Sequence, residues 1–385
     1  MTIIRHESQW RPEWAARVES IGFNYHSGGQ RPTDDEPASY WYEGAYYEFT
    51  AAQVDEIEAA TEEIHRLCLE AAMYCSMRPE LLTKLGIPAA YHGMVADSLG
   101  RGDPSLYGRM DFAYDGKSPP KLLEYNADTP TTVIETAVAQ WYWLTDTFPE
   151  SDRPDQFNSL HEKLIDRWRE LNRGSLFHFS AAADSLEEFS TVEYLRDCAQ
   201  QAGLATSFTS LDSIGWNGSN FEDHAGRPIR YWFKLYPWEW MAKDEFGANM
   251  PMTADRMGVL EPAWKMILSN KGILPILWEL NPKHPNLLPA FWERPRSPGW
   301  VMKPTLGREG ANISMESENG ILATSGVYGD GPFIFQKKAD LPVFDGQRIV
   351  IGSWLVGDKS AGMIVREDES PIITGNSRIV PHIFR

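Results

Sequence analysis

Side chains of the kind that hold a divalent cation occur together in the segment RMDFAYDGKSPPKLLEYNADTPT, residues 109–131. Asp111 precedes a turn-forming stretch, and Glu124 and Asn126 follow it. Mg²⁺ prefers oxygen ligands, takes few of them from protein, and completes its shell with water and phosphate oxygens. The segment therefore predicts a magnesium site at Asp111, Glu124 and Asn126. An ordinary acidic hairpin is the alternative interpretation.

A second segment, VMKPTLGREGANI at residues 301–313, has the chemistry of phosphate binding. Lys303 ends an apolar run, and Arg308 lies between Gly307 and Gly310. Glycine lets backbone N–H groups approach a phosphate closely, and the two cations would neutralise phosphate charge. Neither GxxxxGK[ST] nor GxGxxG is present, so this is not a P-loop or a dinucleotide fingerprint. The two segments together predict a Mg-ATP site, with a plain hairpin loop as the alternative for the second.

Three further cations stand out in the sequence. Arg109 has the same strand parity as Asp111, so it would share a face with it and could grip a carboxylate or phosphate; a surface ion pair with Asp111 is the alternative. Lys271 precedes an apolar run in SNKGILP, where by itself it is typical of a helix end or a turn. Arg366 begins REDES, which by itself is typical of a charged hairpin tip.

The elements that must position these residues follow from hydrophobic spacing and turn signals. Strands are expected at 106–114 and 121–126, and the turn DGKS between them would bring Asp111 near Glu124 and Asn126. Thr129 and Pro130 are typical of a helix start, which predicts a helix over 131–147 whose free N–H groups face the strand end. Apolar residues at helical spacing predict a long helix over 51–77.

Mixed strands and helices along the rest of the chain predict an α+β fold rather than a regular βαβ repeat. Residues 1–50 are expected to be irregular but packed, and subdomain boundaries are expected near 149–154 and 293–299. The other expected elements are helices at 157–171 and 187–202, strands at 230–235, 300–302, 333–337, 348–356 and 362–366, and a turn at 357–359.

Composition excludes several classes of protein. The 385 residues are 42% hydrophobic and 23% charged, which indicates a folded chain. The formal net charge of −18 disfavours nucleic acid and favours a cationic partner, although it also serves solubility. No apolar run is long enough to span a membrane. Three cysteines without zinc spacing and a polar first segment lead us to expect a cytoplasmic protein. HExxH and GxSxG motifs are absent.

Taken in order, four segments resemble the synthetase domain of glutathionylspermidine synthase, and the resemblance covers most of the chain. They are RMDF…LLEYNADTPT at 109–131, NKGILPILWELNP at 270–282, KPTLGREGANI at 303–313 and VFDGQRIVIGSWLVGDKSAGMIVREDES at 343–370. The resemblance implies a single ATP-grasp-like synthetase unit over 1–385, without the amidase domain of the family's bifunctional members. It implies ATP and Mg²⁺ as cofactors.

The resemblance also implies a role for each candidate residue. Asp111, Glu124 and Asn126 are implied as magnesium ligands, Lys271 and Lys303 as ATP-binding lysines, and Arg308 as a phosphate or transition-state contact beside Gly307 and Gly310. Arg109 and Arg366 are implied as substrate or phosphate arginines, and Glu187 and Glu188 as an acidic pair that contacts a glutathione-like substrate. The turn at 357–359 is shorter than the family's, so the substrates differ from glutathione and spermidine in one interpretation.

Three functions follow from these expectations. The first is an ATP-dependent ligase that joins a carboxylic acid to a cationic amine through an acyl phosphate. The second is an ATP-grasp peptide ligase with an amino-acid acceptor, and the charge preferred in the acceptor separates these two. The third is a non-catalytic nucleotide- or polyamine-binding protein. Retention of all three metal candidates and both lysines argues against the third.

Overall fold

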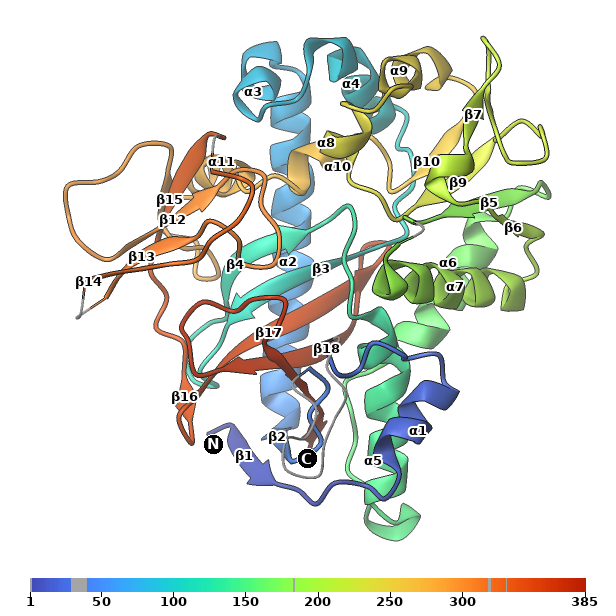
Figure 1. Cartoon of the computed structure of the whole chain (residues 1–385). Helices are drawn as coiled ribbons and strands as arrows, with labels where there is room; N and C mark the ends of the chain where they lie inside the picture. The colour runs from blue at the N-terminus through green and yellow to red at the C-terminus, as the bar shows by residue number, and fades with distance from the viewer. Residues whose placement is uncertain (1, 29–39, 183, 318–319, 330) are drawn as a thin grey trace.

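The computed structural model describes residues 2–28, 40–182, 184–317, 320–329 and 331–385. Sheets pack around the long helix α2 (Ala51–Ser76), which runs behind the central strands in Figure 1. A capping box between Thr50 and Gln53 begins this helix, and the helix ends one residue before the predicted limit. Cys68 and Cys75 are buried on it, as free thiols in the core.

A six-stranded antiparallel sheet forms the centre of the molecule. Its main path is β19-β18-β17-β3-β4, and β16 pairs with β17. The predicted hairpin is confirmed, because Asp111 lies opposite Glu124 and Arg109 lies opposite Asn126. The strands are β3 (Tyr107–Ala113), β4 (Lys121–Asn126), β16 (Val343–Phe344), β17 (Gln347–Val356), β18 (Lys359–Asp368) and β19 (Arg378–Val380).

A second antiparallel sheet has the order β11-β15-β12-β13-β14. The glycine loop with Arg308 connects β12 to β13, which are paired neighbours, so it is a hairpin connection as the alternative interpretation held. The strands are β11 (Ala290–Phe291), β12 (Trp300–Pro304), β13 (Ser314–Ser317), β14 (Gly320–Ala323) and β15 (Phe333–Lys337).

A third sheet is parallel throughout and was not anticipated from the sequence. Its order is β10-β9-β5-β6, and helix α7 (Leu186–Gln201) connects β5 to the adjacent parallel strand β6. Helix α6 (Leu160–Leu171) packs against α7. The strands are β5 (Phe177–Ser180), β6 (Thr206–Phe208), β9 (Tyr231–Lys234) and β10 (Gly258–Leu260). The α+β assignment holds for the molecule, and this part has βαβ connectivity.

The N- and C-terminal strands pair in one small sheet, β1-β2-β20, which places the two termini close together (Figure 1). The expectation that residues 1–50 are irregular was therefore wrong in part. The strands in this segment are too short to stand out in the sequence. These elements are β1 (Ile4–Glu7), α1 (Trp14–Ser20), β2 (Ala45–Phe49) and β20 (His382–Phe384).

The predicted helix over 131–147 begins later than expected. Thr132 has φ 72°, a left-handed conformation that cannot continue into a helix, and helical backbone begins at Val133. One turn of π-helix, η2 (Glu135–Ala139), precedes α5 (Gln140–Thr147). The reason is tertiary: Arg109 Nη1 donates to the Thr131 carbonyl at 2.8 Å and to Thr132 Oγ1 at 3.1 Å, which keeps these residues in the loop.

The remaining elements connect these layers. They are α3 (Pro79–Lys84), α4 (His92–Gly100), β7 (Gly215–Trp216), β8 (Phe221–Glu222), α8 (Trp238–Met241), α9 (Met250–Thr253), α10 (Lys265–Leu268) and α11 (Ile273–Leu280). REDES is not a hairpin tip, since β18 extends to Asp368 and Glu367 is fully buried. The turn after β17 contains only Gly357 and Asp358, because Lys359 begins β18.

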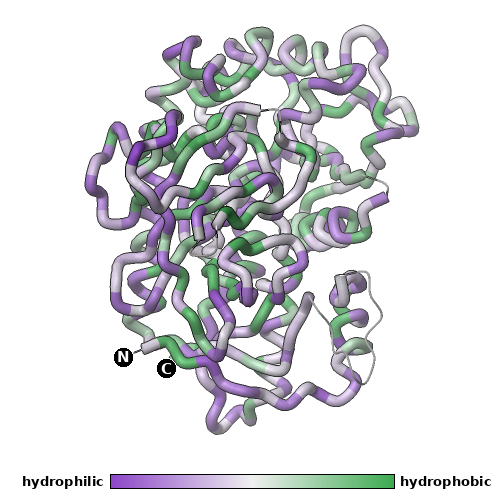
Figure 2. The backbone as a smooth tube through the Cα atoms, turned by 60° about the vertical axis from the view of Figure 1, so that its left-hand side comes forward, coloured by the Kyte–Doolittle hydropathy of each residue, from purple (hydrophilic) through white to green (hydrophobic). Residues whose placement is uncertain are grey.

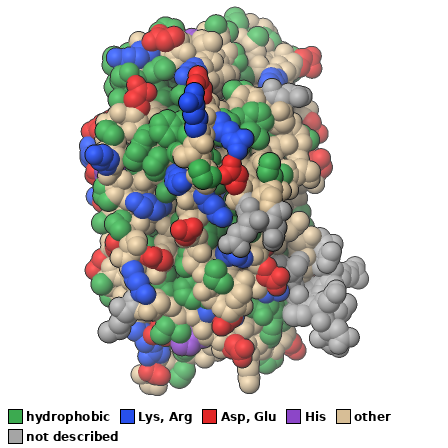
Figure 3. Space-filling model, turned by 90° about the vertical axis from the view of Figure 1, so that its left-hand side faces the viewer, with side chains coloured by type: hydrophobic (Ala, Val, Ile, Leu, Met, Phe, Trp, Pro, Cys, Tyr) green, Lys and Arg blue, Asp and Glu red, His purple; other side chains and the backbone are tan. Residues whose placement is uncertain are grey.

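Hydrophobic stretches follow the interior strands, and hydrophilic ones follow peripheral loops (Figure 2). On the face shown in Figure 3, lysine and arginine side chains alternate with acidic and apolar ones among the described residues, a mixed surface rather than a continuous basic field. Within the described ranges, every helix is too short or too polar to cross a membrane.

Candidate active site

A pocket of about 470 Å³ lies between the two antiparallel sheets. Strands β3, β4, β17 and β18 supply one wall and β12, β13 and β15 the other, while helix α7 closes one side. Ten of the twelve predicted site residues lie in this region as lining residues. They are Arg109, Asp111, Glu124, Asn126, Glu187, Glu188, Lys303, Arg308, Gly310 and Arg366.

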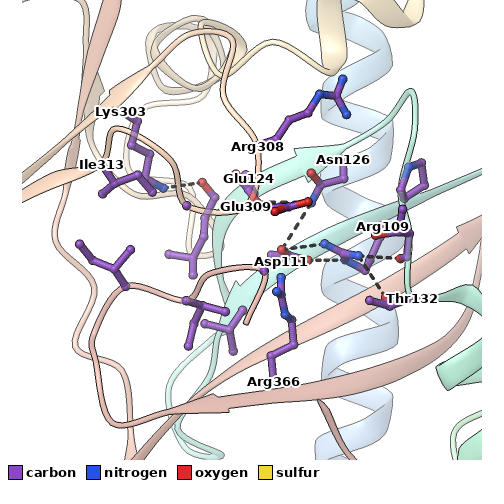
Figure 4. Close-up of a pocket in the computed structure, with 18 of the residues that line it drawn as sticks. Arg109, Asp111, Glu124, Asn126, Thr132, Lys303, Arg308, Glu309, Ile313 and Arg366 are labelled. Atoms are coloured by element: carbon purple, nitrogen blue, oxygen red, sulfur yellow. Dashed lines mark hydrogen bonds and ion pairs between the residues drawn. The ribbon is translucent and has the colours of Figure 1, made fainter. Parts of the chain in front are cut away.

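The three magnesium candidates converge on one point of the hairpin (Figure 4). Asn126 Nδ2 lies 3.4 Å from both Asp111 Oδ2 and Glu124 Oε1, so two carboxylates and one amide share a face. Across the described residues, no group of three or more His, Cys, Asp or Glu side chains forms an alternative metal cluster. Few protein oxygens beside an open cavity fit Mg²⁺, which retains water and phosphate ligands.

Arg109 pairs with Asp111 in a bidentate arrangement, with Nε donating to Oδ1 at 2.8 Å and Nη2 donating to Oδ2 at 3.2 Å. The sequence left open a surface ion pair, but both side chains are buried, with 5% of each residue exposed. Burial works against the charge of Arg109, yet Asp111 outweighs it and the pKa of the guanidinium is raised. Arg109 thus fixes Asp111 and, through its Thr131 contact, the loop beside the pocket.

Two lysines from distant segments converge on Glu124. Lys271, in the turn between α10 and α11, pairs with Glu124 Oε2 at 2.8 Å and donates to the Gly307 carbonyl at 2.7 Å. Lys303 donates to the Leu123 carbonyl at 3.0 Å and to Gln336 Oε1 at 2.7 Å. Burial opposes ionisation of Glu124, but Lys271 and Lys303 outweigh it and lower the pKa of Glu124 to about 2.

Lys303 has a lowered pKa. Burial lowers its pKa to about 8, with Lys271 adding to the effect and Glu124 opposing it. Lys271 and Lys303 thus bring two positive charges to the single carboxylate of Glu124. Paired cations of this kind suit an anionic phosphate chain.

Arg308 reaches across the pocket from the glycine loop. Its Nη1 donates to Thr129 Oγ1 at 2.6 Å and its Nη2 to Glu239 Oε1 at 3.0 Å, while Nε has no partner. A Cβ atom at Gly307 would meet Pro304 Cγ at 2.7 Å, and one at Gly310 would meet the Ile373 carbonyl at 2.5 Å. Both loop positions therefore need glycine for close packing, and Gly310, with φ 70°, also needs it for its conformation.

Arg366, Glu187 and Glu188 line one end of the pocket, which is called the far end below. Arg366 rises from β18 toward Asp111 in Figure 4, its Nη2 donates to the Thr374 carbonyl at 2.5 Å, and its Nε is unpartnered. Glu187 and Glu188 lie at the start of α7, where burial raises the pKa of both carboxyls. The positive charges of Arg366 and Arg109 oppose the rise in the pKa of Glu187, so cationic and acidic groups lie close together at this end.

Several lining residues had no signal in the sequence. Gln336 on β15 holds Lys303, and Glu239, next to the lining residue Trp240, holds Arg308. Tyr25 and Tyr40 line the pocket from the N-terminal region. A search for charged motifs passes over them, and their places depend on contacts between residues far apart in sequence.

Known proteins are similar to this chain along its whole length. The family described as glutathionylspermidine synthase preATP-grasp matches residues 5–385. A Haemophilus influenzae protein with the provisional name acid–amine ligase is 40% identical, over 97% of this chain and 97% of that protein. The bifunctional glutathionylspermidine synthetase/amidase of Escherichia coli is 29% identical over 99% of this chain, which spans 65% of that protein.

A trypanothione synthetase of Crithidia fasciculata is 29% identical over 81% of this chain and 52% of its own length. The solved structure of a glutathione synthetase-like effector from Globodera pallida has a TM-score of 0.56 at 10% identity, over 98% of both chains. That similarity establishes the fold alone.

The fold and these relatives define the class as an ATP-dependent ligase that forms C–N bonds. Within that class, the chain belongs to the glutathionylspermidine synthase preATP-grasp family.

Proposed function

We propose that this protein joins a carboxylic acid to a cationic amine in an amide bond, with ATP converting the acid to an acyl phosphate. The observation that carries the proposal is the convergence of Lys271 and Lys303 on Glu124, beside Asp111 and Asn126, with Arg308 lining the same pocket. Three segments far apart in the sequence supply the oxygen ligands and the cations that phosphoryl transfer needs.

Each residue has a task in this proposal. Asp111, Glu124 and Asn126 would hold Mg²⁺, which when bound would supply positive charge against the phosphates. Lys303 and Lys271 would hold phosphate oxygens. Arg308 lies on the loop that covers the pocket, so its guanidinium can meet charge that develops on the transferred group, and the loop excludes water from the acyl phosphate.

The substrates are proposed from the far end of the pocket. Arg109 and Arg366 both act electrostatically on Glu187, and a planar guanidinium fork suits a carboxylate. Glu187 and Glu188 supply negative charge for an ammonium group. The Escherichia coli relative is named a glutathionylspermidine synthetase, so we propose a glutathione-like peptide acid and a polyamine as the substrate classes. With its buried free thiols, the protein is proposed to work in the cytoplasm.

An ADP-release screen tests this function. Purified protein with Mg-ATP is supplied with pools of carboxylic acids and amines, and Glu124→Gln is the matched inactive variant. Release of ADP that needs both an acid and a cationic amine, and that Glu124→Gln abolishes, is the expected result. A preference for amino acids as acceptors would favour the peptide-ligase alternative, and ADP release from no pool would overturn the proposal.

A further inference from the structure

A buried carboxylate beside the pocket has no role in the site described above. Glu135 lies at the start of η2, and none of its surface is exposed. Its carboxylate accepts hydrogen bonds from Tyr40 Oη at 2.7 Å and from Tyr25 Oη at 3.1 Å. Both tyrosines line the pocket. Hydrogen bonds from these two phenol hydroxyl groups therefore connect the carboxylate to the pocket.

Glu135 lies close in sequence to a residue that is held by a side chain of strand β3. Thr132, three residues earlier, is held in its left-handed conformation by Arg109, the same side chain that fixes Asp111. The π-turn that starts at Glu135 inserts an extra residue into the helix and so changes the direction in which its first side chain points. Such turns are frequent at functional sites, and here the turn places an acid behind two pocket tyrosines.

Two other buried acids of this protein are carboxylates held by an ion pair with an arginine. Glu43 pairs with Arg11 at 2.6 Å, and Glu367 pairs with Arg5 at 3.0 Å. Glu135, by contrast, has no ion pair with any cationic side chain in the described ranges. A buried charge without a partner is costly, so an acid kept this way needs another explanation than stability.

The groups around Glu135 keep its proton affinity high. Glu187 on α7 adds negative charge, and the apolar buried face of α6 packs against η2, whereas Arg366 on β18 opposes the rise in the pKa of Tyr40. Burial, followed by the charge of Glu187, raises the pKa of Glu135 to about 7, against the hydrogen bonds from its two tyrosines. A group with this pKa exchanges a proton readily near neutral pH.

An amine acceptor arrives as an ammonium ion, which has no lone pair and cannot attack a carbonyl carbon. We propose that Glu135, acting through the Tyr40 hydroxyl, accepts the proton that activates the amine; this inference rests on the proposed function. Tyr40 would touch the substrate, and Glu135 would set the proton affinity of Tyr40. The 2.7 Å hydrogen bond makes Tyr40, rather than Tyr25, the relay.

The step balances as follows. The ammonium N–H gives its proton to Tyr40 Oη while the Tyr40 proton passes to the Glu135 carboxylate, which leaves a neutral amine and a neutral carboxylic acid. The amine lone pair forms the C–N bond at the acyl carbon, and the C–O bond to phosphate breaks with its electron pair. The departing phosphate takes the second nitrogen proton, and Glu135 returns its own to solvent.

Hydroxylamine separates this role from a structural one, because it is already neutral at pH 7 and needs no base before it attacks an acyl phosphate. Glu135→Gln and Tyr40→Phe should lower the rate with spermidine by about 100-fold at pH 7. Both variants should keep hydroxamate formation within about twofold of wild type, which also shows that they fold. Tyr142→Phe is the matched control and should retain both activities, because Tyr142 on α5 is 48% exposed and does not line the pocket.

The pH profile gives a second measurement. The wild-type rate with spermidine should level off above about pH 7, whereas that of Glu135→Gln should keep rising as the amine itself ionises. Equal spermidine rates and profiles in wild type and both variants, or an equal loss with hydroxylamine, would overturn the inference alone. A wild-type protein that forms no hydroxamate from any acid would overturn the proposed function and this inference with it.

Discussion

Replacing Lys303 by methionine tests the phosphate end of the pocket. Methionine keeps the apolar stem of the side chain and removes the ammonium group that donates to Leu123 and Gln336. A hydrogen bond from a charged donor contributes about 1.5–3 kcal/mol. The Kd for Mg-ATP should therefore rise about 10- to 100-fold, since each 1.4 kcal/mol is about a factor of ten.

The pH dependence follows from the same group. Burial lowers the pKa of Lys303 to about 8, and only the ammonium form attracts phosphate. The charge is present below that pKa and is lost from the free protein as the pH rises through it. The protonated fraction falls from about nine-tenths at pH 7 to about one-tenth at pH 9, so wild-type affinity should fall about tenfold.

Calorimetry with a non-hydrolysable Mg-ATP analogue at pH 7, 8 and 9 measures both effects. Lys359→Met is the matched control, because the Lys359 side chain is 70% exposed and pairs with Glu62 instead of facing the pocket. The control should retain the affinity and the pH slope of wild type. Wild-type affinity in Lys303→Met, or an unchanged pH slope in that variant, would refute the assignment of Lys303 to phosphate.

Three further predictions concern the metal ligands, the loop and the acceptor. Glu124→Gln should abolish ADP release, because it removes a charged ligand, and should leave the protein folded at a lower thermal unfolding temperature, because Lys271 loses its partner; full turnover would exclude Glu124 as a ligand. Arg308→Ala should lower kcat more than it raises the ATP KM, and residues 306–312 should gain hydrogen-exchange protection with Mg-ATP; protection equal in both states would count against a closing loop. Added salt should raise the KM for a polyamine more than that for ATP, because the Debye length is only about 8 Å at physiological ionic strength; equal salt effects on both would argue against an acidic acceptor site.

The hairpin of Asp111 and Glu124 could be predicted because its information is local. Strand parity sets which residues share a face, and the turn between the strands sets the register. Lys271 could not be placed in the same way, since it lies in a turn between α10 and α11. Its backbone N–H donates to the Thr305 carbonyl at 2.8 Å, and this contact between segments 34 positions apart brings it to Glu124.

The parallel sheet and Glu135 were missed for different reasons. Strands β5 and β6 have four and three residues, too few for a periodic pattern, and both faces of β5 are buried. Glu135 falls within an apolar stretch that a 3.6-residue period assigns to one helix, and no such period reveals a π-turn. Its partners Tyr25 and Tyr40 come from the N-terminal region, at sequence separations of 110 and 95 residues.

Asp128 connects the parallel sheet and helix α8 to the loop that follows strand β4. One carboxylate oxygen accepts from Lys234 Nζ on the parallel sheet and the other from the Trp238 backbone N–H on α8, both at 2.9 Å. The neighbouring residues Thr129 and Glu239 are those that hold Arg308. A chimaera that exchanges residues 177–260 for those of a relative must therefore carry matching residues at 128 and 129, or the exchange would also displace Arg308, the proposed phosphate contact.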